Sequence, residues 1–214
     1  MFKHVLFDVQ PERKVSAEGL RWPVGAEVET DSGLGCNREY CDLRGLSWTD
    51  ARQIHALELA MIRKIESGEE PGEDYASIED ELESTDETGL LMGLDIGVAS
   101  TVAALSAARC IPVTSCNGGA FGIPHHEAHP LVVFCARPQQ LELLVQGAEK
   151  AGVGLVSNAS GHLVVYADDI RKMPAFALAL IETRAAFRQQ RFRTSGKPGA
   201  DKDFTHASQL KLFD

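Results

Sequence analysis

The chain has 214 residues, a formal net charge of −10 at pH 7 and a hydrophobic fraction of 44%. Such a composition is typical of a globular protein that buries a core, and the acidic balance argues against indiscriminate nucleic-acid binding. No apolar run of about 18 residues occurs, so we expect a soluble protein without a membrane span. The odd number of cysteines, five, and the lack of a signal-peptide pattern favour free thiols and a cytoplasmic location.

Changes in composition divide the chain into three parts. Residues 1–93 are expected to form an N-terminal extension, with strand-like segments near residues 5–9 and 24–30 that prolines and glycines separate. Residues 94–193 are expected to form an α+β core. Residues 194–214 are predicted to be a polar tail.

The extension contains one well-marked helix. Ser47 and Asp50 have the spacing of a capping box with Asp in place of Glu, and a helix is predicted over residues 48–66, ended by Gly68. The apolar positions at helical spacing are Ile54, Leu57, Met61 and Ile65. The following segment, residues 66–87, holds eleven acidic side chains and no Lys or Arg. We expect it to be a surface excursion, in part helical, and a candidate surface for a protein partner.

The core alternates between helical and strand patterns. Asp95 stands where the N-cap of the first helix belongs, and Pro138 and Gly152 mark the start and end of a later one. The expected elements are a helix at 95–109, strands at 111–115 and 131–136, a helix at 138–151, hairpin strands at 153–157 and 162–167, and a helix at 174–191. This order predicts an α+β fold in which helices pack on a mixed β-sheet.

The loop between the two central strands, residues 114–129, concentrates reactive side chains. Cys116 is followed by Asn117, Gly118 and Gly119, and glycines allow successive backbone N–H groups to converge on an anion, an oxyanion or a thiolate. Together with Ser115, these three residues are candidates for cofactor binding. The alternative interpretation is a tight turn that follows a buried thiol.

The same loop holds four more candidates for catalysis, His125, His126, Glu127 and His129. Imidazoles ligate metals and transfer protons near neutral pH, so His125 and His129, with the Cys116 thiolate, are a candidate zinc site. The HExxH pattern is not met, and no Pro-Cys-x-x-Cys follows to complete a zinc-deaminase signature. Imidazoles that orient a substrate or bond to the backbone are the alternative.

Two residues outside the loop can reach it if the strand ends align. Asp95 precedes the helix before the first central strand, and His162 opens the second strand of the hairpin. Asp95 is therefore also a catalytic candidate, although the simpler interpretation of Asp95 is an N-cap. The simpler interpretation of His162 is an ordinary strand residue. Cys36 and Cys41 have a spacing that zinc sites allow but no second matching pair.

Residues 94–170 resemble the tRNA wybutosine-synthesis methyltransferase family. The resemblance lies in Leu94-Asp-Ile, in the segment Pro112-Val-Thr-Ser-Cys-Asn-Gly118 and in His129-Pro-Leu-Val-Val-Phe134. That family carries Thr-Ser-Ser-Cys-Ser-Gly-Arg, so Asn117 and Gly119 differ from its Ser and Arg. The resemblance implies an S-adenosylmethionine-dependent methyl transfer to a modified guanosine in tRNA.

Three hypotheses therefore remain. The first is an enzyme related to that family, with its site in the loop, S-adenosylmethionine as cofactor and a nucleotide or RNA as substrate. The second is a metal-assisted or thiol-based hydrolase that uses the same loop on a small-molecule substrate, with zinc as the cofactor in its metal-assisted form. The third is a non-enzymatic binding or regulatory protein that acts through the acidic segment, residues 66–87.

Overall fold

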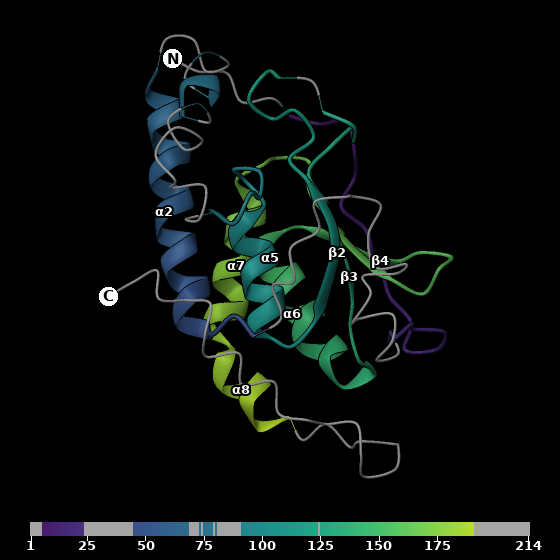
Figure 1. Ribbon diagram of the computed structural model, residues 1–214. Coiled ribbons are helices and arrows are strands. Elements are labelled where there is room, and N and C mark those ends of the chain that lie inside the picture. Colours follow the sequence, from purple (N-terminus) through teal and green to yellow (C-terminus); the bar gives the residue numbers. More distant parts are fainter. Residues whose placement is uncertain are drawn as a thin grey trace.

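The structure is a computed structural model (Figure 1), and it describes residues 6–23, 45–68, 73, 75–78, 80, 91–123 and 125–190. Its elements in chain order are β1 (Arg13–Lys14), α2 (Trp48–Ser67), α5 (Ala99–Ala107), β2 (Ile111–Cys116), β3 (Leu131–Cys135), a 3-10 turn (Pro138–Gln140), α6 (Leu141–Ala151), β4 (Gly154–Ser157), β5 (Leu163–Tyr166), α7 (Lys172–Glu182) and α8 (Arg184–Gln189). The predicted α+β fold is confirmed.

The five strands form one mixed sheet in the order β1-β4-β5-β3-β2. Among the described strands, β1 and β4 pair in parallel, and the other three pairings are antiparallel. The predicted neighbours 111–115 and 131–136 are the antiparallel pair β2 and β3, whose register shifts between Pro112 and Thr114. Strands β1 and β2 lie at the two edges of the described sheet.

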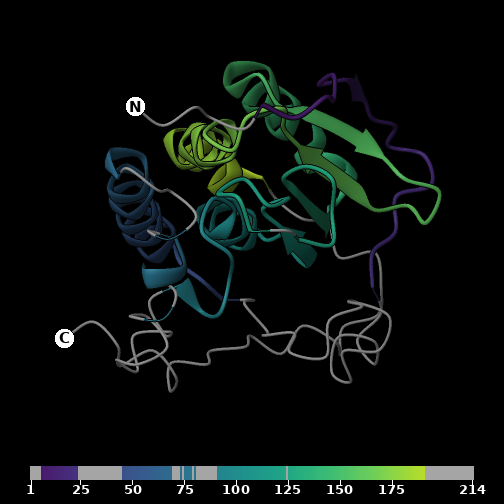
Figure 2. The same ribbon diagram turned by 90° about the horizontal axis from the view of Figure 1, so that it is seen from above.

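Helices α5, α6 and α7 lie on one side of the sheet, and α2 packs outside them against α5 and α7, as Figure 2 shows from above. Alternate strand residues that face these helices are completely buried, namely Val132, Phe134, Leu155, Leu163 and Val165. Helix α2 contributes Ile54, Ile62 and Ile65 to the same hydrophobic core. The helix of the extension is therefore part of the packing that supports the sheet.

Local sequence signals set the ends of several helices. The Ser47 side chain accepts hydrogen bonds from the backbone N–H groups of Thr49 and Asp50, and the Asp50 carboxylate accepts one from Ser47 N–H at 2.7 Å, so the capping box is confirmed. Gly152 ends α6 at φ 70°, which favours glycine. The predicted stripe on α6 is buried at Leu144 and Ala148 and half-buried at its other two positions.

Four local predictions are wrong or lie outside the described residues. Residues 6–9 form no strand, and the predicted strand at 24–30 and the tail at 194–214 lie outside the described part of the chain. The last helix is two helices, α7 and α8, because the Thr183 hydroxyl bonds back to the carbonyl groups of Ala179 and Leu180 where the helix breaks.

Asp95 is not an N-cap. Helix α5 begins at Ala99, and its N-cap residue is Val98, whose side chain makes no hydrogen bond to the first turn. The carboxylate of Glu58, from α2, takes the capping role instead and accepts hydrogen bonds from Gly97 N–H at 2.9 Å and Ser100 N–H at 3.2 Å. This arrangement leaves the Asp95 side chain available for the loop after β2.

A candidate metal centre

The loop after β2 is folded by two consecutive glycines. Gly118 and Gly119 have φ angles of 68° and 75°, a backbone conformation that residues with a side chain rarely adopt. A Cβ on Gly118 would lie 2.4 Å from the carbonyl carbon of His129, so only glycine allows the two parts of the loop to approach so closely. The turn brings the second half of the loop back over the end of β2, where Cys116 stands.

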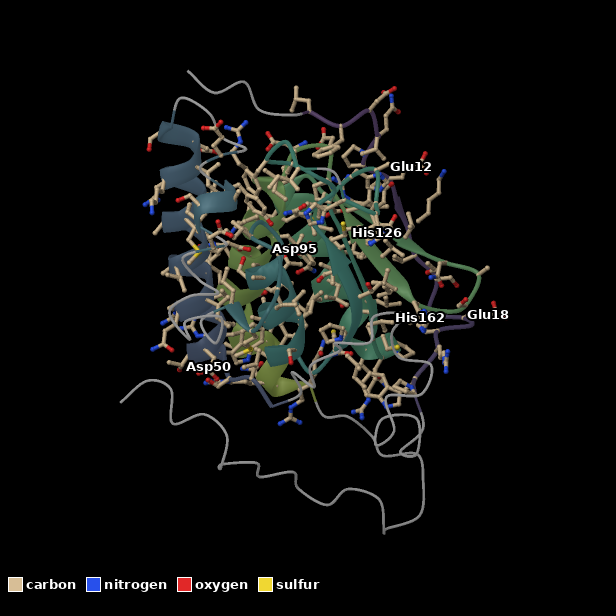
Figure 3. The ribbon with its side chains drawn as sticks, turned by 45° about the horizontal axis from the view of Figure 1, so that its top comes forward. Glu12, Glu18, Asp50, Asp95, His126 and His162 are labelled. Atoms are coloured by element: carbon tan, nitrogen blue, oxygen red, sulfur yellow. The ribbon has the colours of Figure 1, made fainter. Side chains whose placement is uncertain are left out.

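Asp95, Cys116 and His125 meet at this point. The Cys116 Sγ atom lies 3.7 Å from His125 Nδ1, and the same Nδ1 atom lies 3.5 Å from Asp95 Oδ2. One potential ligand atom from each residue lies within 4.8 Å of those of the other two. We call this group the Asp95–Cys116–His125 cluster. Figure 3 labels Asp95 at the junction between the helices and the sheet.

The backbone of the loop holds two of these side chains in place. Asn117 N–H donates to Asp95 Oδ2 at 3.2 Å, and Gly118 N–H donates to Cys116 Sγ at 3.4 Å. The glycine turn therefore presents an N–H group to the sulfur. Such bonds stabilise a thiolate and orient metal ligands.

Two of the three spacings within the cluster agree with those of ligands around a single zinc ion. Zn–S bonds are about 2.3 Å and Zn–N and Zn–O bonds about 2.0–2.1 Å, so tetrahedral geometry separates S from N by about 3.6 Å and N from O by about 3.4 Å. The two distances that involve His125 Nδ1, 3.7 Å and 3.5 Å, are within about 0.2 Å of these values. Thiolate, imidazole and carboxylate are all accepted zinc ligands.

The cluster lies at the protein surface. The His125 and Asp95 side chains are 20% and 28% exposed, whereas Cys116 is buried at 8%. Among the described residues the group has three members, and each offers one ligand atom. Three protein ligands at a partly exposed position would leave a fourth coordination position for water or substrate, as in catalytic zinc sites.

The other candidates in the loop lie outside the cluster. His126 and Glu127 are exposed, and the His129 ring packs edge-on against Tyr166, with 5.5 Å between ring centroids. Ser115 is half-buried within β2. The structure thus brings together only one of the three histidines, His125, with Cys116.

His162 does not reach the cluster. The register pairs Cys116 with Leu131 and Leu131 with Tyr166, at the opposite end of β5 from His162. Figure 3 accordingly shows His162 beside the turn between β4 and β5, near Glu18 and apart from Asp95. Cys36 and Cys41 lie outside the described residues.

The sequence-based reasoning overlooked two buried residues near the site, Tyr75 and Glu58. Tyr75 is completely buried although it lies in the acidic segment, and its hydroxyl accepts a hydrogen bond from Asn117 Nδ2 at 3.2 Å. A tyrosine and an isoleucine within a run of acidic residues were the only signal for this contact. Glu58 occupies the buried face of α2 between Ile54 and Ile62, so a charged residue in an apolar stripe was the available signal.

Glu58 is a completely buried carboxyl group. Burial raises its pKa to about 7, because the loss of hydration outweighs the hydrogen bonds from Ser100, Gly97 and Ala99, which lower it. Its contacts with Gly97 and Ser100 fix the turn that carries Asp95. Glu58 thereby links α2 to the position of a cluster residue.

Comparisons of the chain with protein-family models, with curated proteins and with solved structures find no match. The resemblance of residues 94–170 to the wybutosine-synthesis methyltransferases therefore stays a prediction. None of the described helices has both the length and the apolar character that a membrane crossing requires.

Proposed function

We propose that this protein is a metal-dependent hydrolase in which Asp95, Cys116 and His125 bind one zinc ion. The observation that supports the proposal best is the convergence of the Cys116 Sγ and Asp95 Oδ2 atoms on one nitrogen, His125 Nδ1. This makes the second of the three hypotheses, in its metal-assisted form, the preferred one.

The geometry favours a metal over a thiol nucleophile. In a Cys–His–Asp triad, one ring nitrogen faces the thiol and the other faces the carboxylate. Here a single ring nitrogen lies within 4 Å of both partners. One cation shared by all three groups fits this arrangement, whereas a relay through the ring does not.

The chemistry follows from the number and kind of ligands. A zinc ion held by these three groups would lower the pKa of a bound water molecule to about 7 and so supply hydroxide at neutral pH. Attack of that hydroxide on a carbonyl or phosphoryl centre would expel the leaving group with a proton, so that one water molecule is added across the bond. The chain's own part is to orient the three ligands and keep one side of the site open.

The first experiment measures zinc in the purified protein by elemental analysis, together with Asp95→Asn, Cys116→Ser and His125→Gln variants. The matched control is His126→Gln, because His126 is an exposed neighbour outside the cluster. We expect about one zinc ion per chain in the wild type and in the control, and substantially less in each cluster variant. Cobalt substitution adds a spectroscopic readout, because a sulfur ligand gives a charge-transfer band that Cys116→Ser removes.

The second experiment screens ester, amide and phosphoester substrates before and after chelation. Activity that is lost with the metal and restored by zinc supports the proposal. The proposal is overturned if the wild-type protein binds no metal. It is also overturned if the cluster variants contain as much zinc as the wild type. Zinc bound without any hydrolysis limits the role of the cluster to structure or binding, and the third hypothesis would then lead.

A further inference from the structure

The acidic segment has one buried anchor near the cluster. Among the described residues of this segment, Tyr75 is the one that is completely buried, and its ring stacks on Phe121, with 5.1 Å between centroids and 16° between planes. Phe121 belongs to the loop that carries His125. The segment is therefore fixed to the loop by an aromatic contact as well as by the bond to Asn117.

Asn117 connects this anchor to two cluster residues. It follows Cys116 directly, it is 1% exposed, and its Nδ2 atom donates to the Tyr75 hydroxyl at 3.2 Å and to the Ile96 carbonyl at 3.3 Å. Its Oδ1 atom accepts from Gly119 N–H at 3.0 Å. Its own backbone N–H donates to Asp95.

We infer that Tyr75 is a positioning residue for the Asp95–Cys116–His125 cluster and that it acts through Asn117. The inference rests on the proposed function, since it concerns the affinity of the same metal site. The Tyr75 hydroxyl restrains the Asn117 side chain, and the Asn117 backbone sets the direction of its bond to Asp95. Outer hydrogen bonds of this kind hold ligands in the orientation that the metal needs.

The consequence is a link between metal binding and the segment that holds eleven acidic side chains over residues 66–87. A change that displaces Tyr75 releases the side chain of Asn117 and weakens metal binding, although no acidic side chain of that segment need touch the metal. What Tyr75 would regulate is the affinity of the cluster for a divalent cation such as zinc.

The test is the affinity of metal-free protein for zinc, measured by competition with a chromophoric chelator, in wild type and Tyr75→Phe. Phenylalanine keeps the ring stacked on Phe121 and removes only the hydroxyl. Tyr166→Phe is the matched control, because it also removes a hydroxyl with two hydrogen-bonded partners, Gln10 and Glu12, outside the Asn117 network. We expect zinc to bind Tyr75→Phe about tenfold more weakly, at the low end of what loss of an outer hydrogen bond costs, and the control to match the wild type.

A second variant identifies the route. In an Asn117→Ala background, Tyr75→Phe should have no further effect on zinc affinity if Tyr75 acts through Asn117, whereas independent effects would multiply. The cobalt spectrum gives a readout that a purely structural role would not change, and the melting temperature of the metal-free protein reports folding. Where Asn117→Ala does not fold, the comparison of Tyr75→Phe with its control decides.

The possible results separate the inference from the proposed function. A wild-type protein without zinc affinity refutes the proposed function itself. Zinc binding by the wild type with equal affinity in Tyr75→Phe overturns the inference alone. Equal weakening in Tyr75→Phe and Tyr166→Phe also overturns it, because the loss would then reflect general stability.

Discussion

Replacement of Glu58 by Gln should change how the stability of the protein depends on pH. Glu58 is completely buried, and its pKa is raised from 4.5 to about 7 because burial removes the hydration of the charged form. A shift of this size corresponds to about 3 kcal/mol of folding free energy, since one pKa unit is worth about 1.4 kcal/mol. Glutamine fills nearly the same space without an ionisable group.

The sign follows from the two states of the chain. Below pH 4.5 the carboxyl group is neutral in the folded and the unfolded protein, so its favourable contribution is fully present. Between pH 4.5 and about 7 the unfolded chain loses the proton while the folded chain keeps it, and stability falls as the pH rises. Above pH 7 the group is charged in both states, and the whole contribution has been lost.

The assay is urea denaturation between pH 4.5 and 8 in the presence of a chelator, so that metal binding does not contribute. The free energy of unfolding of Glu58→Gln minus that of the wild type should rise by about 3 kcal/mol from pH 4.5 to pH 8. The pH dependence is the test rather than the absolute value, because Gln can accept only part of the hydrogen bonds from Gly97 and Ser100. Glu149→Gln, on the exposed face of α6, should reproduce the wild-type curve.

A difference between Glu58→Gln and the wild type that stays constant with pH would refute this reasoning. It would mean that the hydrogen bonds and the partial positive charge at the start of α5 balance the cost of burying the carboxylate. A difference that falls with pH would mean that these bonds dominate.

Two further predictions concern the loop and the core. Gly118→Ala should destabilise the protein by about 2 kcal/mol more than Gly93→Ala, because of overpacking, and should abolish zinc binding. Both residues have φ 68°, but of the two an added Cβ meets backbone atoms of His129 and Pro130 at Gly118 and nothing within 4 Å at Gly93. Equal unfolding midpoints for the two variants would show that the loop relaxes around the extra atom. Leu144→Ala, at a completely buried position of α6, should lower the unfolding free energy by about 3 kcal/mol while zinc affinity, measured below the unfolding transition, stays as in the wild type. A loss below 1 kcal/mol would contradict the burial of α6.

The sequence predicted the elements whose ends depend on local chemistry. Ser47 and Asp50 bond within one turn, and Gly152 adopts a left-handed conformation that its own lack of a side chain allows. The strand at 131–136 was likewise predictable, because its residues are apolar almost throughout. These signals need no knowledge of distant partners.

The features that the sequence did not predict depend on contacts between segments far apart in the chain. The local sequence predicts Asp95 as an N-cap, because it precedes a helical pattern. The capping group is instead Glu58, which lies 39 residues before Gly97 in the sequence. Likewise, the loop offered three histidines, and the choice of His125 follows from the fold of the Gly118–Gly119 turn. The burial of Tyr75 depends on Phe121, 46 residues later, which no local pattern in an acidic segment reveals.

The two edge strands of the described sheet, β1 and β2, affect how readily a strand from a second copy of the chain can be added. A free edge strand is a template for a strand from another molecule, and β1 offers only two residues there, both charged, Arg13 and Lys14. At the other edge, β2 contains Pro112, which has no N–H group to donate, and its register shifts immediately afterwards. Both edges of the described sheet thus carry residues that disfavour strand addition, two charged side chains in β1 and a proline beside a register shift in β2.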